Sequence, residues 1–187
     1  GEPVELRSPA AAISHRIGMI HQHFMLVDTL TVADNVTLGT RHRHRLRTDR
    51  TTEEAHVAEL ASRYDLDVDP TAMVWQLSVG EQQRVEILKA LYRHSDILVL
   101  DEPSAVLTPF ETEELFGIIR SLTAAGTTVI FITHKLNEVL EVSDRITVLR
   151  DGVREITRPA EGATARELAR LMTGEERTLE VEHRTVT

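Results

Sequence analysis

The sequence predicts an α/β domain that is built on a mostly parallel sheet and carries an inserted helical subdomain. Three short apolar segments have the length of buried strands, at residues 17–20, 97–100 and 128–133. Helical patterns separate these segments, as the crossover connections between parallel strands require. Residues 39–84 hold helical patterns and no strong strand pattern, which indicates that a helical subdomain interrupts the α/β core.

Capping signals place the helices along the chain. Ser78 and Glu81 have the spacing of a capping box. Thr108, Pro109 and Glu111 combine a cap, a first-turn proline and a box partner. The expected helices span residues 31–38, 51–64, 78–92, 108–126, 135–142 and 164–172.

The two ends of the sequence carry weaker signals. Near the C-terminus, Asp151-Gly152 is a hairpin turn signal between two expected strands, at residues 145–149 and 153–157. The charged tail at residues 175–187 has the composition of a linker. Residues 1–12 are expected to form a turn and a strand that already belong to a domain, so we expect the N-terminus to be truncated.

Composition excludes several classes of protein. The 187 residues are enough for one domain with a sizeable core, and a net charge of -9 disfavours non-specific binding to nucleic acid. The absence of cysteine excludes disulfides and thiolate metal sites. No apolar run approaches the roughly 18 residues that span a bilayer, and no signal peptide opens the sequence, so we expect a cytoplasmic protein without a membrane span.

Two adjacent carboxylates, Asp101 and Glu102, follow the apolar strand at residues 97–100. Ligands of open α/β sheets bind at the carboxyl ends of the strands, where these side chains are expected. A carboxylate in such a place holds magnesium, and a second one polarises an attacking water. An isolated Asp-Glu pair is more often a pair of solvated loop acids, but the preceding strand and Pro103 favour a functional site.

The run Leu77-Ser78-Val79-Gly80-Glu81-Gln82-Gln83-Arg84 predicts a helix start that binds an anion. A capped N-terminus presents backbone N–H groups and the positive end of the helix dipole. Gly80 has no side chain, so a phosphate can approach the backbone closely. An ordinary capped helix is the alternative, which the length of the matching run disfavours.

Polar residues follow the other two expected strands. Gln22 comes after residues 17–20, where it would orient a water or ligate magnesium, and His134 comes after residues 128–133, where it would donate to a terminal phosphate. Either residue alone is more often structural, but their order relative to the other motifs favours a functional role. His42 and His44 lie in an arginine-rich loop without an evident third metal ligand, so a solvated loop is favoured there.

Together these motifs resemble the nucleotide-binding domain of ABC transporters over nearly the whole chain. The matching segments are Gln22 (the Q-loop glutamine), Leu77–Gln82 (the signature), Asp101 and Glu102 (the Walker B aspartate and catalytic glutamate), Ser104–Thr108 (the D-loop) and His134 (the switch histidine). The resemblance implies a P-loop NTPase-like, RecA-like fold that binds ATP and Mg²⁺. It also implies roles for the following residues: Glu102 and His134 in catalysis, Asp101 and Gln22 on magnesium, and Gln22, Ser78, Gly80, Glu81 and Gln82 on the nucleotide.

The resemblance further implies partners and an organisation. The segments His21–Leu26 and Pro103–Pro109 are similar to the first ATPase domain of importers for simple sugars and nucleosides. In that group ATP lies between one domain's phosphate loop and a second domain's signature, and closure drives transmembrane permease subunits at the inner face of the plasma membrane. Residues 1–38 then form part of the catalytic core, 39–84 the helical subdomain, 85–174 the rest of the core, and 175–187 a linker.

Some features depart from the family pattern. Val79 and Glu81 replace the usual signature glycine and glutamine, and Thr108 replaces the D-loop aspartate, as in the sugar-importer branch. The glycine-rich Walker A loop is missing, because neither Lys89 nor Lys135 follows a glycine. We therefore expect a fragment without its first strands, which alone binds MgATP weakly or not at all and is inactive. The alternatives are a non-catalytic remnant and a non-transport ABC protein that acts on ribosomes or DNA.

Overall fold

The computed structural model describes residues 3–40 and 50–174 of the chain. Within it the chain divides into two compact units, Gly1–Thr133 and His134–Thr187. The predicted positions of His42 and His44, and the predicted linker at 175–187, lie outside the described residues. The division of the chain at residues 38, 84 and 174 stays a prediction.

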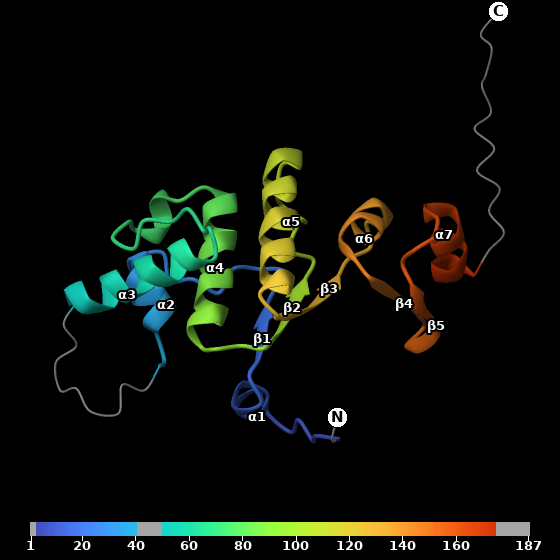
Figure 1. Cartoon of the computed structure of the whole chain (residues 1–187), viewed down its shortest axis with the longest axis horizontal. Helices are drawn as coiled ribbons and strands as arrows, with labels where there is room; N and C mark the ends of the chain where they lie inside the picture. Colours follow the sequence, from blue (N-terminus) through green and yellow to red (C-terminus); the bar gives the residue numbers. More distant parts are fainter. Residues whose placement is uncertain (1–2, 41–49, 175–187) are drawn as a thin grey trace, which may run out of the picture. The chain divides into compact units, whose positions relative to one another are not determined.

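The first unit contains a parallel sheet, as the sequence predicts, and its three strands lie in the order β1-β2-β3 (Figure 1). The strands are β1 (Ile17–Ile20), β2 (Ile97–Asp101) and β3 (Thr128–Ile132). In register, Ile20 lies beside Leu100, and Asp101 lies beside Ile132. The three carboxyl ends therefore meet at one edge, with β2 in the middle.

Helices of the first unit cover one face of this sheet and form a separate helical group. Leu98 and Leu100 of β2 are fully buried, and α4 and α5 contact β1 and β3. Figure 1 shows α2, α3 and α4 grouped beside the sheet, where they contact one another. The elements are α1 (Pro9–Ser14), α2 (Val32–Thr37), α3 (Arg50–Arg63), the 3-10 turn η1 (Val74–Gln76), α4 (Val79–Tyr92) and α5 (Pro109–Ala124).

The opposite face of the sheet is half exposed. Met19 of β1 is 47% exposed, and Ile130 and Ile132 of β3 are 48% and 45% exposed. Val99 of β2 lies in register between Met19 and Ile130. Since parallel sheets are normally covered on both faces, this apolar stripe is an unusual surface.

The second unit is a small α/β module with its own core. Its elements are α6 (Leu136–Val142), β4 (Arg145–Arg150), β5 (Val153–Pro159) and α7 (Ala165–Thr173), and β4 and β5 pair antiparallel. Ile146, Val148 and Leu168 form the buried cluster. Asp151 and Gly152 both have positive φ, 51° and 76°, which confirms the predicted hairpin turn.

The predicted strand within residues 1–12 is wrong, because a helix, α1, begins there at Pro9. Ser8 caps it by accepting a hydrogen bond from the backbone N–H of Ala11 at 3.2 Å. Serine before a first-turn proline is a helix start signal that the apolar composition of the segment obscured.

Candidate functional site

The strand ends bring three of the predicted site residues to one edge of the sheet. Asp101 is the last residue of the central strand β2, and Glu102 follows it. Both side chains are half-buried. Gln22 lies two residues beyond the end of β1, at the same edge, and is exposed.

Glu102 has an unusual backbone conformation. Its φ is 49°, in the left-handed region that non-glycine residues rarely adopt. Its N–H donates to the carbonyl of Ile132 at 2.9 Å, and its carbonyl accepts from the N–H of Ala105 at 3.1 Å. Non-glycine residues in this region concentrate at functional sites, where the surrounding structure enforces them. The bend turns the chain from β2 towards the buried Ser104 and the start of α5.

The loop that carries Gln22 is held by α4. The N–H of Met25 donates to Oε1 of Glu86 at 2.6 Å. Nζ of Lys89 donates to the carbonyl of Met25 at 2.8 Å and pairs with Glu86 Oε2 at 3.4 Å. The sequence analysis did not identify Glu86 or Lys89 as residues that support the site. The one indication in the sequence is that both lie on the helix that begins with the predicted signature.

A second anchor fixes the same loop further along. Oδ1 of Asn35, on α2, accepts from the N–H of Val27 at 2.7 Å. Its Nδ2 donates to the carbonyls of Val27 and Thr31 at 3.1 and 3.0 Å. Asn35 is only 1% exposed, so these bonds are made within the interior of the helical group.

The start of α4 has the predicted capping box. The N–H of Glu81 donates to Ser78 Oγ at 3.3 Å, and the N–H of Ser78 donates to Glu81 Oε2 at 2.7 Å. The hydrogen bond from the Ser78 backbone lowers the pKa of Glu81, and a hydrogen bond with the Ser78 side chain lowers it further. Nε2 of Gln82 donates to the carbonyl of Leu77 at 3.1 Å. Ser78 itself is exposed at the tip of the helix.

A carboxylate of the chain itself reaches Gly80. Oε1 of Glu111 accepts from the N–H of Gly80 at 3.1 Å, while Oε2 accepts from the N–H of Thr108 at 2.8 Å. These hydrogen bonds lower the pKa of Glu111. The largest effect comes from the backbone N–H of Thr108, and the Thr108 hydroxyl and the Gly80 N–H act in the same direction. In this structure the anion that approaches Gly80 closely is Glu111, and the predicted approach of a phosphate there stays a prediction.

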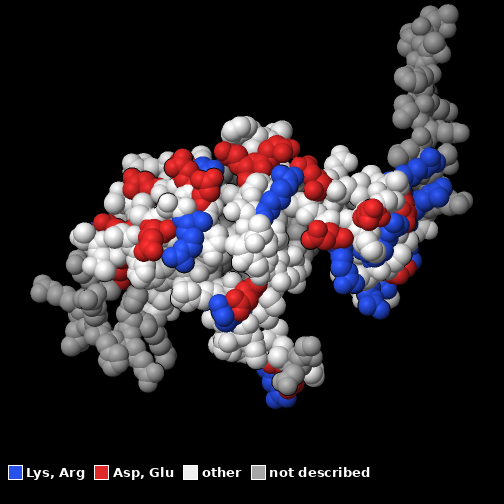
Figure 2. Space-filling view, viewed as in Figure 1, with Lys and Arg blue, Asp and Glu red and all other residues white. Residues whose placement is uncertain are grey.

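Acidic side chains surround these helix starts. Figure 2 shows them gathered over the part of the first unit where α4 and α5 begin, and Glu81, Glu111 and Glu114 belong there. Arg84 pairs with Glu114 at 3.2 Å within this region. Negative side chains at helix N-termini are stabilised by the helix dipoles.

His134 is the first residue of the second unit and follows β3 by two positions. It is exposed. The neighbouring Lys135 pairs with Glu138 of α6 at 3.1 Å. The predicted switch histidine therefore lies at the boundary between the two units along the sequence.

The sheet edge fits magnesium of the kind that nucleotides carry. Among residues 3–40 and 50–174, no three histidine or acidic side chains gather into a metal site. Magnesium bound with nucleotide needs only one or two carboxylates, with phosphates and waters as its other ligands. A half-buried Asp101 at the end of the central strand has that chemistry.

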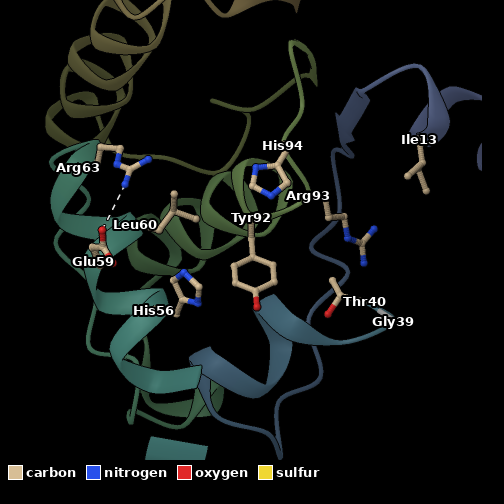
Figure 3. A pocket seen from close by; sticks show the side chains of 10 residues that line it. All are labelled: Ile13, Gly39, Thr40, His56, Glu59, Leu60, Arg63, Tyr92, Arg93 and His94. Carbon is tan, nitrogen blue, oxygen red and sulfur yellow. Dashed lines mark hydrogen bonds and ion pairs between the residues drawn. The ribbon is translucent and has the colours of Figure 1, made fainter. Parts of the chain in front are cut away.

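A cavity of about 570 Å³ lies elsewhere in the first unit, between α3 and the end of α4. Figure 3 shows His56 and Tyr92 projecting into it, and burial, followed by the charge of Glu53, raises the pKa of Tyr92. The cavity lies at the C-terminal end of α4, about 20 Å along the helix from its capped start. It is therefore separate from the predicted nucleotide site.

No helix in the described parts of the chain has the length and apolar character needed to cross a membrane.

Comparison with known proteins identifies related chains. The family model described as ABC transporter matches residues 2–105. The nucleoside import ATP-binding protein NupA of Lactococcus lactis subsp. cremoris is 48% identical over 174 residues, which are 93% of this chain and 34% of that protein. The glucose import ATP-binding protein TsgD13 of Haloferax volcanii is 46% identical over an alignment of 206 positions, which covers 94% of this chain and 37% of that protein. The chain spans about a third of the length of these relatives.

A solved structure agrees with this relationship. The dimeric, post-hydrolysis state of the ATP-binding cassette MJ0796, bound to ADP and Pi, matches with a TM-score of 0.67 and 27% identity. The match covers 85% of this chain and 70% of that chain, and it confirms the predicted P-loop NTPase-like fold. Since the family model covers more than half of the chain, this chain belongs to the ABC transporter family.

Proposed function

We propose that this chain is part of the ATP-hydrolysing subunit of an importer for simple sugars or nucleosides. The observation that carries the proposal is the placement of Asp101 and Glu102 at the end of the central strand, beside the Gln22 loop. The names of the relatives, which are import proteins for a nucleoside and for glucose, support the class of cargo.

In this proposal each of the four predicted residues has one task. Asp101 holds magnesium, which when bound neutralises charge on the phosphates. Glu102 accepts a proton from the attacking water, and Gln22 helps to orient that water and the metal. His134 donates a hydrogen bond to the terminal phosphate. Positioning and charge neutralisation supply most of the catalysis in phosphoryl transfer.

The start of α4 serves a different nucleotide. Ser78 is exposed at the capped helix end, where the dipole favours an anion. We propose that this end, including Ser78, Gly80, Glu81 and Gln82, faces ATP held by the phosphate loop of a second ATPase domain. The pair of domains would act at the cytoplasmic face of the membrane on transmembrane permease subunits.

The test is ATP hydrolysis by the whole transporter that contains this chain, reconstituted with its permease in vesicles. Glu102→Gln keeps the shape of the side chain and removes the base, so hydrolysis by this site falls about 100-fold or more while ATP still binds. Glu113→Gln is the matched control, because Glu113 is an exposed acid of α5. Unchanged hydrolysis in Glu102→Gln would show that the Walker B glutamate has no catalytic role here.

A further inference from the structure

One side chain, Glu111, connects the beginnings of two helices. Its Oε2 accepts from both the N–H and the hydroxyl of Thr108, each at 2.8 Å, at the start of α5. Its Oε1 accepts from the N–H of Gly80 at 3.1 Å, at the start of α4. The local capping box of α5 uses only one of its two oxygens, so the other is available for this link between the helices.

The backbone of α4 is shaped to receive this carboxylate. A Cβ added at Gly80 would lie 2.7 Å from Oε1 and 3.0 Å from Cγ of Glu111, closer than such atoms approach. Gly80 is itself buried, so its N–H would lose water without a replacement acceptor. The contact therefore depends on both residues, because it needs a glycine at position 80 and a carboxylate at position 111.

A second contact joins the same helices one turn further along. Nη1 of Arg84 lies 3.2 Å from Oε2 of Glu114. Arg84 is four residues after Gly80 on α4, and Glu114 is three residues after Glu111 on α5, so the two contacts lie on facing sides of the helices. Because Glu114 is 40% exposed, this ion pair adds little energy.

We propose that Glu111 is a positioning residue that holds the start of α4 in register with the D-loop segment Ser104–Thr108 and the start of α5. This inference rests on the proposed function, in which both segments meet the nucleotide of a second ATPase domain. Ser78 presents the capped helix end to that nucleotide, and Glu111 fixes where the helix end lies. ATP first binds to the phosphate loop of the second domain. When the two domains then close, the start of α4 has to be aligned with the terminal phosphate of that ATP.

The expected signature is therefore a loss of turnover without a loss of ATP binding. In the whole transporter, Glu111→Ala and Glu111→Gln lower kcat about tenfold and change KM for ATP less than about twofold. Glu113→Gln, two residues along α5 and exposed, leaves both constants unchanged. Gly80→Ala pushes Glu111 away and has the same effect as Glu111→Ala. The double variant is no worse than either single variant, because both remove one contact.

Several results would overturn the inference. If kcat per folded complex stays at the wild-type value while the melting temperature falls, Glu111 is only structural. If kcat rises, Glu111 competes with phosphate instead of positioning the helix. Additive effects of Gly80→Ala and Glu111→Ala would also contradict it. A wild-type transporter that hydrolyses no ATP would refute the proposed function instead, and that result is distinguishable from these.

A spectroscopic measurement tests the contact even if the alanine variant does not assemble. In the 187-residue chain, the ¹⁵N–¹H signal of Gly80 should move as acid protonates Glu111, because its N–H donates to that carboxylate. The same titration in Glu111→Gln should move the Gly80 signal much less, leaving only the shift that protonation of the adjacent Glu81 causes, and equal shifts in both proteins would also overturn the inference. A Gly80 signal that does not respond to acid in the wild-type chain would overturn the inference.

Discussion

Oε1 of Glu86 accepts a hydrogen bond from the backbone N–H of Met25 at 2.6 Å, across 61 positions of sequence. Glu86 is only 6% exposed. Lys89, one turn later on α4, donates to the carbonyl of Met25 at 2.8 Å. One helix therefore begins with the predicted signature and holds the loop that follows Gln22. A shift of α4 must move both segments together, which gives the two motifs a direct mechanical connection.

Glu86→Ala should lower the free energy of unfolding by about 2–3 kcal/mol, because it removes a charge-assisted hydrogen bond and leaves Lys89 without its partner carboxylate. Glu86→Gln keeps an acceptor for Met25 and should cost about half as much. Urea denaturation of the 187-residue chain measures both. Glu59→Gln is the control, since Glu59 makes an exposed pair with Arg63 and should matter by less than about 0.5 kcal/mol. Equal effects of Glu86→Ala and Glu59→Gln would contradict the anchoring role.

Local sequence signals predicted much of this structure. The capping boxes of Ser78 with Glu81 and of Thr108 with Glu111 involve residues three positions apart, so the chain needs no tertiary information to form them. The turn at Asp151-Gly152 is equally local. The parallel direction of the strands was accessible too, because apolar segments separated by helices form parallel sheets with their carboxyl ends at one edge.

Contacts between distant residues were not accessible in the same way. Glu111 carries a cap signal, but nothing in the sequence shows that its second oxygen reaches Gly80, which lies 31 positions away. The bond from Met25 to Glu86 depends on how α4 packs against the loop after β1, and no spacing rule encodes it. The sequence therefore identifies the candidate site residues, whereas tertiary packing decides which side chains hold them in place.

Acid should destabilise the chain partly through Glu81. Its pKa is lowered from its ordinary value of 4.5, mainly by the hydrogen bond from the Ser78 backbone. A depressed folded-state pKa contributes stability above the unfolded-state pKa, and this contribution is lost as pH falls through the folded-state value. Melting temperatures measured from neutral pH downward should fall less steeply in Glu81→Gln than in the wild-type chain. The exposed Glu113→Gln should retain the wild-type slope, and identical slopes in all three proteins would refute the prediction.

Gly174→Ala should loosen the end of α7. Gly174 has a φ of 71°, and an added Cβ would lie 2.8 Å from Nη1 of Arg150, which donates to the carbonyl of Leu171 at 3.2 Å. The left-handed backbone alone costs about 1–2 kcal/mol for a residue with a Cβ. Gly152→Ala is a matched control, since its φ is 76° and open space surrounds the new Cβ. Thermal unfolding should show a larger loss for Gly174→Ala, and equal losses would mean that the Arg150 contact is unimportant.

Alternate residues of β3 should respond in opposite ways to substitution. Phe131 packs edge-to-face on Phe116 of α5, with ring centroids 6.1 Å apart, so Phe131→Ala should cost about 3 kcal/mol or more. Ile130 points to the other face and is 48% exposed, so Ile130→Lys should cost less than about 1 kcal/mol. It should also reduce binding of a hydrophobic dye, because it places a charge in the apolar stripe formed with Met19 and Val99. Urea denaturation of both variants measures the loss of stability, and the fluorescence of the dye measures its binding to the apolar stripe. A large loss of stability in Ile130→Lys would show that the stripe is covered in the folded chain.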